Sequence, residues 1–213
     1  MKTKSNYVVQ VMTLLLGVLT LAVVSSCGEK QENGHGYVDL GLPSGTMWAT
    51  CNVGASDPNK YGDYFPWEDI HEAQKQWGGK WRIPTKSEME ELFNFCEVEK
   101  KTEGNIIGIS LKGPNGNSIF IPCAGFKSTD EESVEGLGKY VRMWTDKQTI
   151  TSGQVARGGY TTFSDLPTGY CGKLIINDDG TIKKKTDVSD DIFNYIIYKY
   201  LNSLRLVFTQ ETK

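Results

Sequence analysis

One periodic run of hydrophobic residues follows Pro84, and it predicts the main helix of the chain. Apolar residues recur there at i, i+3, i+4 and i+7, namely Met89, Leu92, Phe93 and Cys96. This spacing places one apolar stripe on a helix over 86–96. The residues from Thr85 to Glu88 fit a capping box, in which each of the two side chains bonds the other residue's backbone N–H group. We expect this helix to pack on a sheet.

Short runs rich in β-branched and aromatic residues predict antiparallel strands. The predicted strands are 37–42, 46–53, 105–112, 117–123, 140–145, 172–176, 181–185 and 203–208. Turn-forming sequences separate three neighbouring pairs of them: Pro43-Ser44-Gly45, Gly113-Pro114-Asn115-Gly116 and Asn177-Asp178-Asp179-Gly180. The pattern indicates an α+β domain with twisted antiparallel sheets, one main packed helix and long loops. Within it, Trp48, Trp81 and Ile83 are expected to be buried.

Two later segments are harder to interpret. Residues 149–172 are rich in Gly, Ser and Thr, so we expect long loops between the hairpin ending near Cys123 and the strand near Lys173. Over 189–201, apolar residues recur at helical spacing after Ser189, a possible N-cap, and this favours a helix. The same segment contains strand-forming Ile, Tyr and Phe, so the choice between helix and strand stays open there.

The N-terminal residues have the composition of an export signal. Lys2 and Lys4 precede an apolar stretch over 7–24. The sequence Val24-Ser25-Ser26-Cys27 then resembles a bacterial lipobox, in which the cysteine thiol takes a diacylglycerol before cleavage. The alternative is an uncleaved membrane anchor, because the stretch is at the lower limit of spanning length.

These features divide the chain into three parts. We expect a lipoprotein signal peptide over 1–26, the lipidated Cys27 with a flexible polar tether over 27–36, and one domain over 37–213. The lipid on Cys27 would attach the protein to a membrane. This organisation predicts an outer membrane lipoprotein of the cell envelope, and whether it faces the periplasm or the cell surface stays open.

Charge argues against a nucleic-acid partner. The chain has 23 basic and 26 acidic residues, and because residues 1–26 contain two lysines and no acid, the remainder has a net charge of −5. Nucleic-acid-binding domains normally carry a clustered basic excess. We expect an acidic domain that binds no nucleic acid.

The spacing of the other four cysteines argues against a metal or redox motif. Cys51, Cys96, Cys123 and Cys171 lie too far apart for the C-x2-C spacing of zinc sites or the C-x-x-C of thioredoxin-like proteins. One or two disulfides are compatible with an exported chain, and so are four buried reduced thiols. The pairing stays open.

No motif of the chain predicts catalysis, a metal or a cofactor. His71-Glu72 begins like the zinc motif H-E-x-x-H, but Lys75 stands where the second histidine belongs. The other histidine, His35, lies in the expected tether. We therefore expect a protein that is not an enzyme and that has neither a cofactor nor a metal.

Candidate ligand-binding residues come from the expected loops. Tyr64 and Trp67 flank Pro66, where their rings could stack against a sugar or a peptide. Arg157, Tyr160 and Tyr170 lie in the long Gly-, Ser- and Thr-rich segment, where loops on a rigid sheet commonly contact ligands.

Several blocks of the sequence also resemble a known family. They are Tyr37 to Gly45, Trp48 to Ala55, Tyr61 to Phe65, Trp77 to Thr85, Gly113 to Pro122 and Ser203 to Val207. In this order they are similar to the Fibrobacter succinogenes major paralogous domain family, over about 37–208. The resemblance implies a C-type-lectin-like fold on exported lipoproteins and surface proteins of gut and oral Bacteroidota. It gives no catalytic residue to transfer.

The sequence therefore favours a lipid-anchored envelope protein that acts as a non-catalytic binding or surface-assembly module for a glycan or protein ligand. Two alternatives are kept. One is an enzyme on a formylglycine-generating-like scaffold, with Cys123 or Cys171 as the reactive cysteine. The other is a structural fimbrial or surface accessory protein. The oligomeric state stays open.

Lipid anchoring can be tested directly. Wild-type protein is expected to partition with membranes and detergent, and Cys27→Ser is expected to lose this partition because the acyl acceptor is gone. Detergent phase separation followed by immunoblotting measures it. Equal partition of the two proteins would contradict the lipobox assignment.

Overall fold

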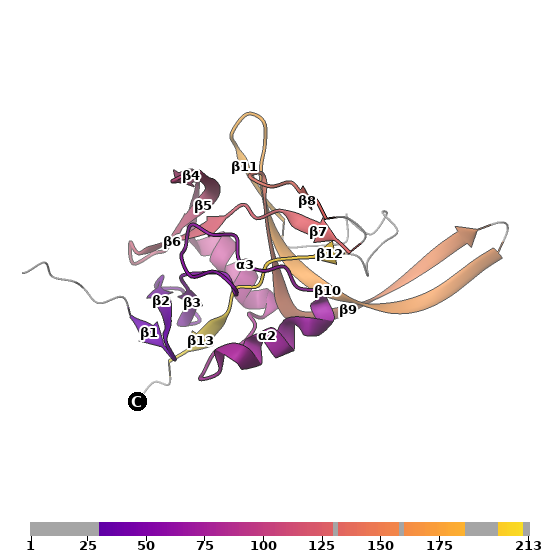
Figure 1. The fold of residues 1–213 in the computed structure, drawn as a ribbon, viewed down its shortest axis with the longest axis horizontal. Coiled ribbons are helices and arrows are strands. Elements are labelled where there is room, and N and C mark those ends of the chain that lie inside the picture. The colour runs from indigo at the N-terminus through magenta and orange to yellow at the C-terminus, as the bar shows by residue number, and fades with distance from the viewer. Residues whose placement is uncertain (1–29, 130–131, 158–159, 186–199, 211–213) are drawn as a thin grey trace, which may run out of the picture.

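The computed structural model describes residues 30–129, 132–157, 160–185 and 200–210, and of these only the backbone for 147–157, 160–170, 185 and 200. They form an α+β fold of mostly antiparallel strands with two α-helices (Figure 1). The helices are α2 (Ile70–Trp77), which follows the short 3-10 turn η1 (Trp67–Asp69), and α3 (Lys86–Phe95). The expected α+β class is confirmed, while the expectation of one main helix missed α2.

The strands form four small sheets. The first, in the order β1-β2-β3-β13, contains β1 (Gln31–Glu32), β2 (His35–Asp39), β3 (Thr46–Ala49) and β13 (Val207–Thr209). The second contains β4 (Glu97–Glu103), β5 (Ile106–Lys112) and β6 (Ser118–Pro122). The third, in the order β12-β7-β8, contains β7 (Phe126–Ser128), β8 (Val134–Glu135) and β12 (Tyr200–Leu201). The fourth contains β9 (Tyr140–Arg157), β10 (Tyr160–Ile176) and β11 (Ile182–Lys185).

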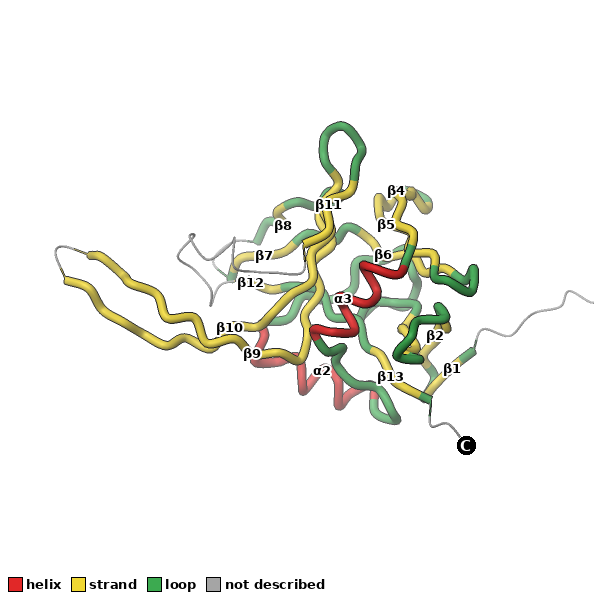
Figure 2. Tube along the Cα trace, turned by 180° about the vertical axis from the view of Figure 1, so that it is seen from behind, coloured by secondary structure: helices red, strands yellow, loops and turns green. Residues whose placement is uncertain are grey.

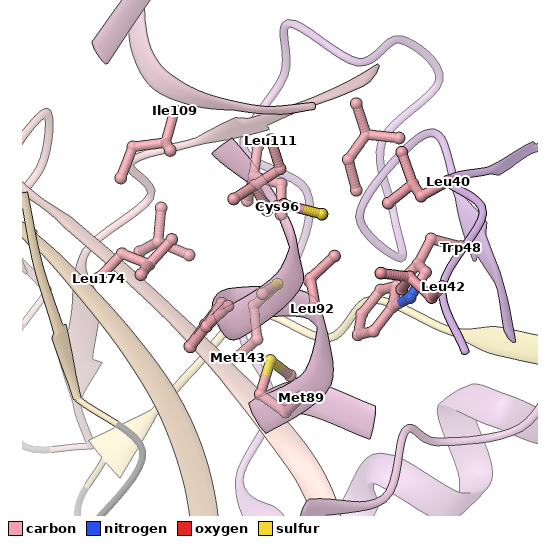
Figure 3. Close-up of a cluster of buried hydrophobic side chains, with 14 of the residues drawn as sticks. Leu40, Leu42, Trp48, Met89, Leu92, Cys96, Ile109, Leu111, Met143 and Leu174 are labelled. Carbon is pink, nitrogen blue, oxygen red and sulfur yellow. The ribbon is translucent and has the colours of Figure 1, made fainter. Parts of the chain in front are cut away.

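Helix α3 lies at the centre of the larger core. Its Met89, Leu92 and Phe93 are fully buried, as the apolar stripe predicted. Figure 3 shows Met89 and Leu92 among residues of other elements, including Leu111 of β5 and Met143 of β9. The helix also approaches β10 closely, because a Cβ atom at Gly172 would lie 2.4 Å from Met89 Cγ. A larger residue at position 172 would therefore displace the Met89 side chain.

A second core lies between α2 and the first sheet. Its buried aromatic residues include Trp77 and Trp81, which contact each other edge to face at 5.0 Å between ring centroids. The expected burial of Trp48, Trp81 and Ile83 is confirmed, with exposed fractions of 0%, 3% and 3%.

The chain enters the fold earlier than the polar sequence of the tether suggested. Residues 31–39 form the β1–β2 hairpin, with Gln31 paired to Gly36 and Glu32 to His35. The His35 ring stacks on Trp77 at 3.8 Å between centroids, and burial lowers the pKa of His35. The expectation of a flexible tether over 31–36 is therefore wrong. Tertiary stacking on Trp77 outweighs the lack of apolar residues in that segment.

The largest difference from expectation lies in the segment predicted as long loops. Backbone pairing continues along β9 and β10 from Tyr140↔Ile175 to Arg157↔Tyr160. The expected loop over 149–172 is therefore wrong: most of it belongs to a long hairpin. Thr and Tyr are common strand formers, and the scattered glycines do not stop the ladder. The helix or strand expected over 189–199 lies outside the described residues, whereas Tyr200 and Leu201 belong to a strand.

The Glu88 carboxylate joins three parts of the fold. It accepts hydrogen bonds from Arg82 Nη1 at 2.7 Å, from the Thr85 backbone N–H at 2.8 Å and from Thr46 Oγ1 of β3 at 2.8 Å. The Thr85 hydroxyl in turn accepts from the Glu88 N–H, so the predicted capping box is confirmed. Arg82 also pairs through its backbone with Val207 of β13. Desolvation raises the pKa of Glu88, but the bonds from Arg82, Thr85 and Thr46 outweigh it and lower the pKa to about 2.

This network predicts a defined loss of stability in acid. Because the folded pKa of Glu88 lies below the ordinary 4.5, the unfolded chain binds more protons between pH 4.5 and about 2. The stabilisation by Glu88 is complete above pH 4.5 and falls as the pH drops toward 2. We expect a loss of about 2 kcal/mol across this window, after allowing for solvent around Arg82.

Urea unfolding at several pH values measures this effect. Glu88→Gln should be less stable at pH 6 and should lack the acid-dependent loss that belongs to Glu88. Glu90→Gln, on the same helix and in an exposed pair with Lys86, is the matched control. Parallel acid profiles for wild type and Glu88→Gln would show that the carboxylate is not held as described.

Candidate functional site

The outer half of the β9–β10 hairpin forms an arm that leaves the body of the molecule (Figure 2). Its strands pair from Gln148↔Gly169 to Arg157↔Tyr160. Strand β11 pairs with β10 only over Lys173 to Ile176, near the body. Within the described residues no further strand pairs with the arm, so both of its edges present backbone N–H and C=O groups.

The arm is held at its base by contacts with three separate parts of the chain. Trp144 is buried in β9, and its Nε1 donates to the Phe65 carbonyl at 2.7 Å. The Trp144 N–H donates to the carbonyl of Ser203, and the Asp146 N–H donates to the carbonyl of Pro84. A shift in register between Gly169 and Cys171 marks the point where the arm leaves the body. The base is therefore fixed by both side-chain and backbone contacts.

Of the predicted site residues, Tyr64 and Trp67 lie near this base. The hydroxyl of Tyr64 donates to the Ala124 carbonyl at 2.5 Å, and Lys127 Nζ lies 5.1 Å from the centre of its ring. Burial, followed by the neighbouring Tyr61, raises the pKa of Tyr64 to about 12. The Trp67 ring packs on the α2 core, and its indole nitrogen is buried. Both residues are half-buried and make contacts that support the fold.

The other three predicted binding residues belong to the arm or its base. Arg157 and Tyr160 are paired at the far end, so they occupy the same face of the ribbon. Tyr170 lies in the irregularity between Gly169 and Cys171. The side chains of these three residues lie outside the described residues. The backbone brings Arg157 and Tyr160 together, and it separates them from Tyr64 and Trp67.

A groove lies between two other strand edges. It has a volume of about 560 Å³ and is bounded by β4 on one side and by the β10–β11 turn and β11 on the other. Cys96, Val98 and Ile182 line it together with charged residues such as Glu99. Lys184 also lines the groove, and its Nζ donates to the Phe93 carbonyl at the end of α3. The groove is open and mixed in polarity.

The cysteines of the described ranges form no disulfide with one another and belong to no metal-binding cluster. Cys51, Cys96, Cys123 and Cys171 are all thiols, which settles the open question of their pairing. Burial raises the pKa of Cys123 to about 12, so this thiol is protonated near neutral pH. In the same ranges no three His, Cys, Asp or Glu residues are grouped to hold a metal ion, and no helix is long and apolar enough to span a bilayer.

Comparison of the chain with protein-family models, with curated proteins and with solved structures gave no match.

Sequence reasoning missed one completely buried polar residue. It is Arg205, which lies in the strand predicted over 203–208. It bonds Asn52, whose own Nδ2 donates to the Tyr61 carbonyl. Single-sequence patterns carry no signal for this burial, because it depends on contacts between residues more than a hundred positions apart.

The assignment of Tyr64 to the fold predicts the effect of removing its hydroxyl. Tyr64→Phe should lower the free energy of unfolding by about 1 kcal/mol, because the Ala124 carbonyl loses its donor. Tyr61→Phe is the matched control, and we expect a change below about 0.5 kcal/mol there. Urea unfolding measures both. A loss of unfolding free energy in Tyr64→Phe no larger than that in Tyr61→Phe would show that the Tyr64 hydroxyl bond adds nothing to stability.

Proposed function

We propose that this chain is a lipid-anchored cell-envelope protein whose domain is a non-catalytic binding or surface-assembly module, with the β9–β10 arm as its contact element. The observation that carries the proposal is the two-stranded arm with both edges unpaired among the described residues. A strand edge is a template for an added strand, as in peptide recognition by β-augmentation. The ligand class best suited to it is an extended protein segment.

The composition of the arm supports an interaction role. Residues 148–156 contain no charged residue and no proline, and the partner strand contains Asp165 and Pro167. Natural sheets protect exposed edges with lysine, proline or short strands. The β9 edge has none of these protections, so it is the edge we propose for the partner strand.

An isolated two-stranded ribbon also gains little stability by itself. Such hairpins are marginal in water, because they bury little apolar surface. A third strand would add ladder hydrogen bonds and cover one edge. Binding of an added strand would therefore stabilise the arm.

We also propose that the fold is C-type-lectin-like and that the chain is related to the Fibrobacter succinogenes major paralogous domain family. Support comes from the sequence blocks, from the antiparallel pairing of β3 with the last strand β13, and from α3 packed against the sheets. The lipobox at Cys27 supports attachment to the outer membrane. The protonated, buried Cys123 weighs against the alternative of an enzyme that uses this thiol.

Site-specific photocrosslinking in cells tests the arm. A benzoylphenylalanine at Val155 of β9 should yield a crosslinked envelope protein, whereas the same residue at Thr181, beside the β10–β11 turn, should not. A variant in which 150–167 is replaced by Asn-Gly should keep the urea midpoint of the body and lose the adduct made from a probe at Gln148.

Three outcomes would contradict the proposal. Equal amounts of crosslinked adduct from the arm and from Thr181 would indicate non-specific encounters and no binding site on the arm. Retention of the partner after shortening would place the contact elsewhere. A glycan-array signal that survives shortening would favour a sugar ligand bound by the body of the domain.

A further inference from the structure

Arg205 is a buried cation without a carboxylate partner among the described residues. Its side chain is completely buried, and its Nε donates to Asn52 Oδ1 at 2.9 Å. Its Nη1 donates to the carbonyls of Ala49 at 3.2 Å, Thr50 at 3.2 Å and Phe120 at 3.1 Å. Nη2 is buried without a hydrogen-bond partner. Carbonyl and amide oxygens solvate this guanidinium, but they do not neutralise it.

An uncompensated buried charge is unfavourable, and a nearby anionic group would offset it. Burial lowers the pKa of Arg205 to about 10, and the electrostatic interaction with Cys51 opposes this lowering. A cation retained in the interior therefore favours a thiolate at position 51.

The hydrogen bonds of Arg205 place its guanidinium beside the segment that contains Cys51. The Thr50 carbonyl that accepts from Nη1 belongs to the peptide bond between Thr50 and Cys51, and Nε bonds the next residue, Asn52. The guanidinium therefore contacts the chain on both sides of Cys51. Thr50 Oγ1 lies 3.7 Å from Cys51 Sγ, within the range of a hydrogen bond to sulfur.

Cys51 also differs from the other thiols in its access to solvent. It is half-buried, whereas Cys96, Cys123 and Cys171 have exposed fractions of 4% or less. Tyr61, whose carbonyl accepts from Asn52, and Asp63, whose N–H donates to the Val53 carbonyl, are further titratable residues beside this segment. Burial raises the pKa of Tyr61, so its phenol stays neutral around pH 7. A thiol that is partly exposed and close to a fixed cation has the environment of reactive cysteines.

We propose that Cys51 is a reactive thiol whose thiolate is favoured by the nearby cation of buried Arg205, and that it forms mixed disulfides with small soluble disulfides. In this step the Cys51 sulfur attacks one sulfur of the disulfide. A new S–S bond forms, the original S–S bond breaks, and the second sulfur leaves as a thiolate that takes a proton from water. The reaction needs no other oxidant.

The test uses the full chain in detergent with glutathione disulfide as the probe. Mass spectrometry of peptides should locate the adduct on Cys51, at a rate at least tenfold above that of each buried thiol. The rate should rise with pH to a midpoint below the ordinary cysteine value of about 8.5. Dithiothreitol should remove the adduct. A midpoint at or above 8.5, or modification of Cys51 no faster than of Cys96, would overturn the proposal.

A variant separates the role of Arg205 from simple exposure. Asn52→Asp keeps an oxygen for Arg205 Nε but adds a competing negative charge, so the midpoint of Cys51 modification should move up. Thr50→Ser keeps the hydroxyl beside the thiol and should leave the midpoint in place. Circular dichroism checks that both variants are folded. An unchanged midpoint in folded Asn52→Asp would show that the cation does not set the reactivity of Cys51.

Discussion

The ion pair between Glu88 and Arg82 links the central helix to strands near both ends of the domain. Glu88 lies in the first turn of α3, Arg82 pairs with Val207 of the last strand, and Thr46 of an early strand donates to the same carboxylate. One carboxylate thus fixes the start of the central helix relative to strands near both ends of the chain. The core beneath it is assembled from residues far apart in sequence. Packing of this core therefore requires that α3 be positioned relative to these strands. Local helix and strand propensities alone would not position it.

Features fixed by local chemistry could be predicted from the sequence. The capping box at Thr85 and the stripe from Met89 identified α3, and the turn at 113–116 identified the β5–β6 hairpin. Features fixed by tertiary contact could not. The β1–β2 hairpin has polar residues and depends on the stacking of His35 on Trp77, while β4 consists mainly of Glu and Lys held by its pairing with β5.

The arm was missed for a different reason. Its sequence lacks the alternation of apolar and polar positions by which strands are recognised. Its Gly-, Ser- and Thr-rich sequence therefore predicted a loop. The candidate residues Arg157 and Tyr160 therefore lie on a paired ribbon and not on a loop. Arg205 and the reactive environment of Cys51 depend entirely on the folded arrangement around residues 49–52.

The early start of the fold has a consequence for how the molecule would stand on a membrane. With a lipid on Cys27 and β1 beginning at Gln31, the connection spans four peptide units, at most about 14 Å when extended. Strand β1 and the arm lie toward opposite ends of the long axis (Figure 1). This short connection would keep the β1 end close to the lipid headgroups of the membrane. An arm of about ten residues per strand would extend by about 30 Å. In the anchored protein, the edges of the β9–β10 arm, which are unpaired among the described residues, would then lie away from the lipid surface.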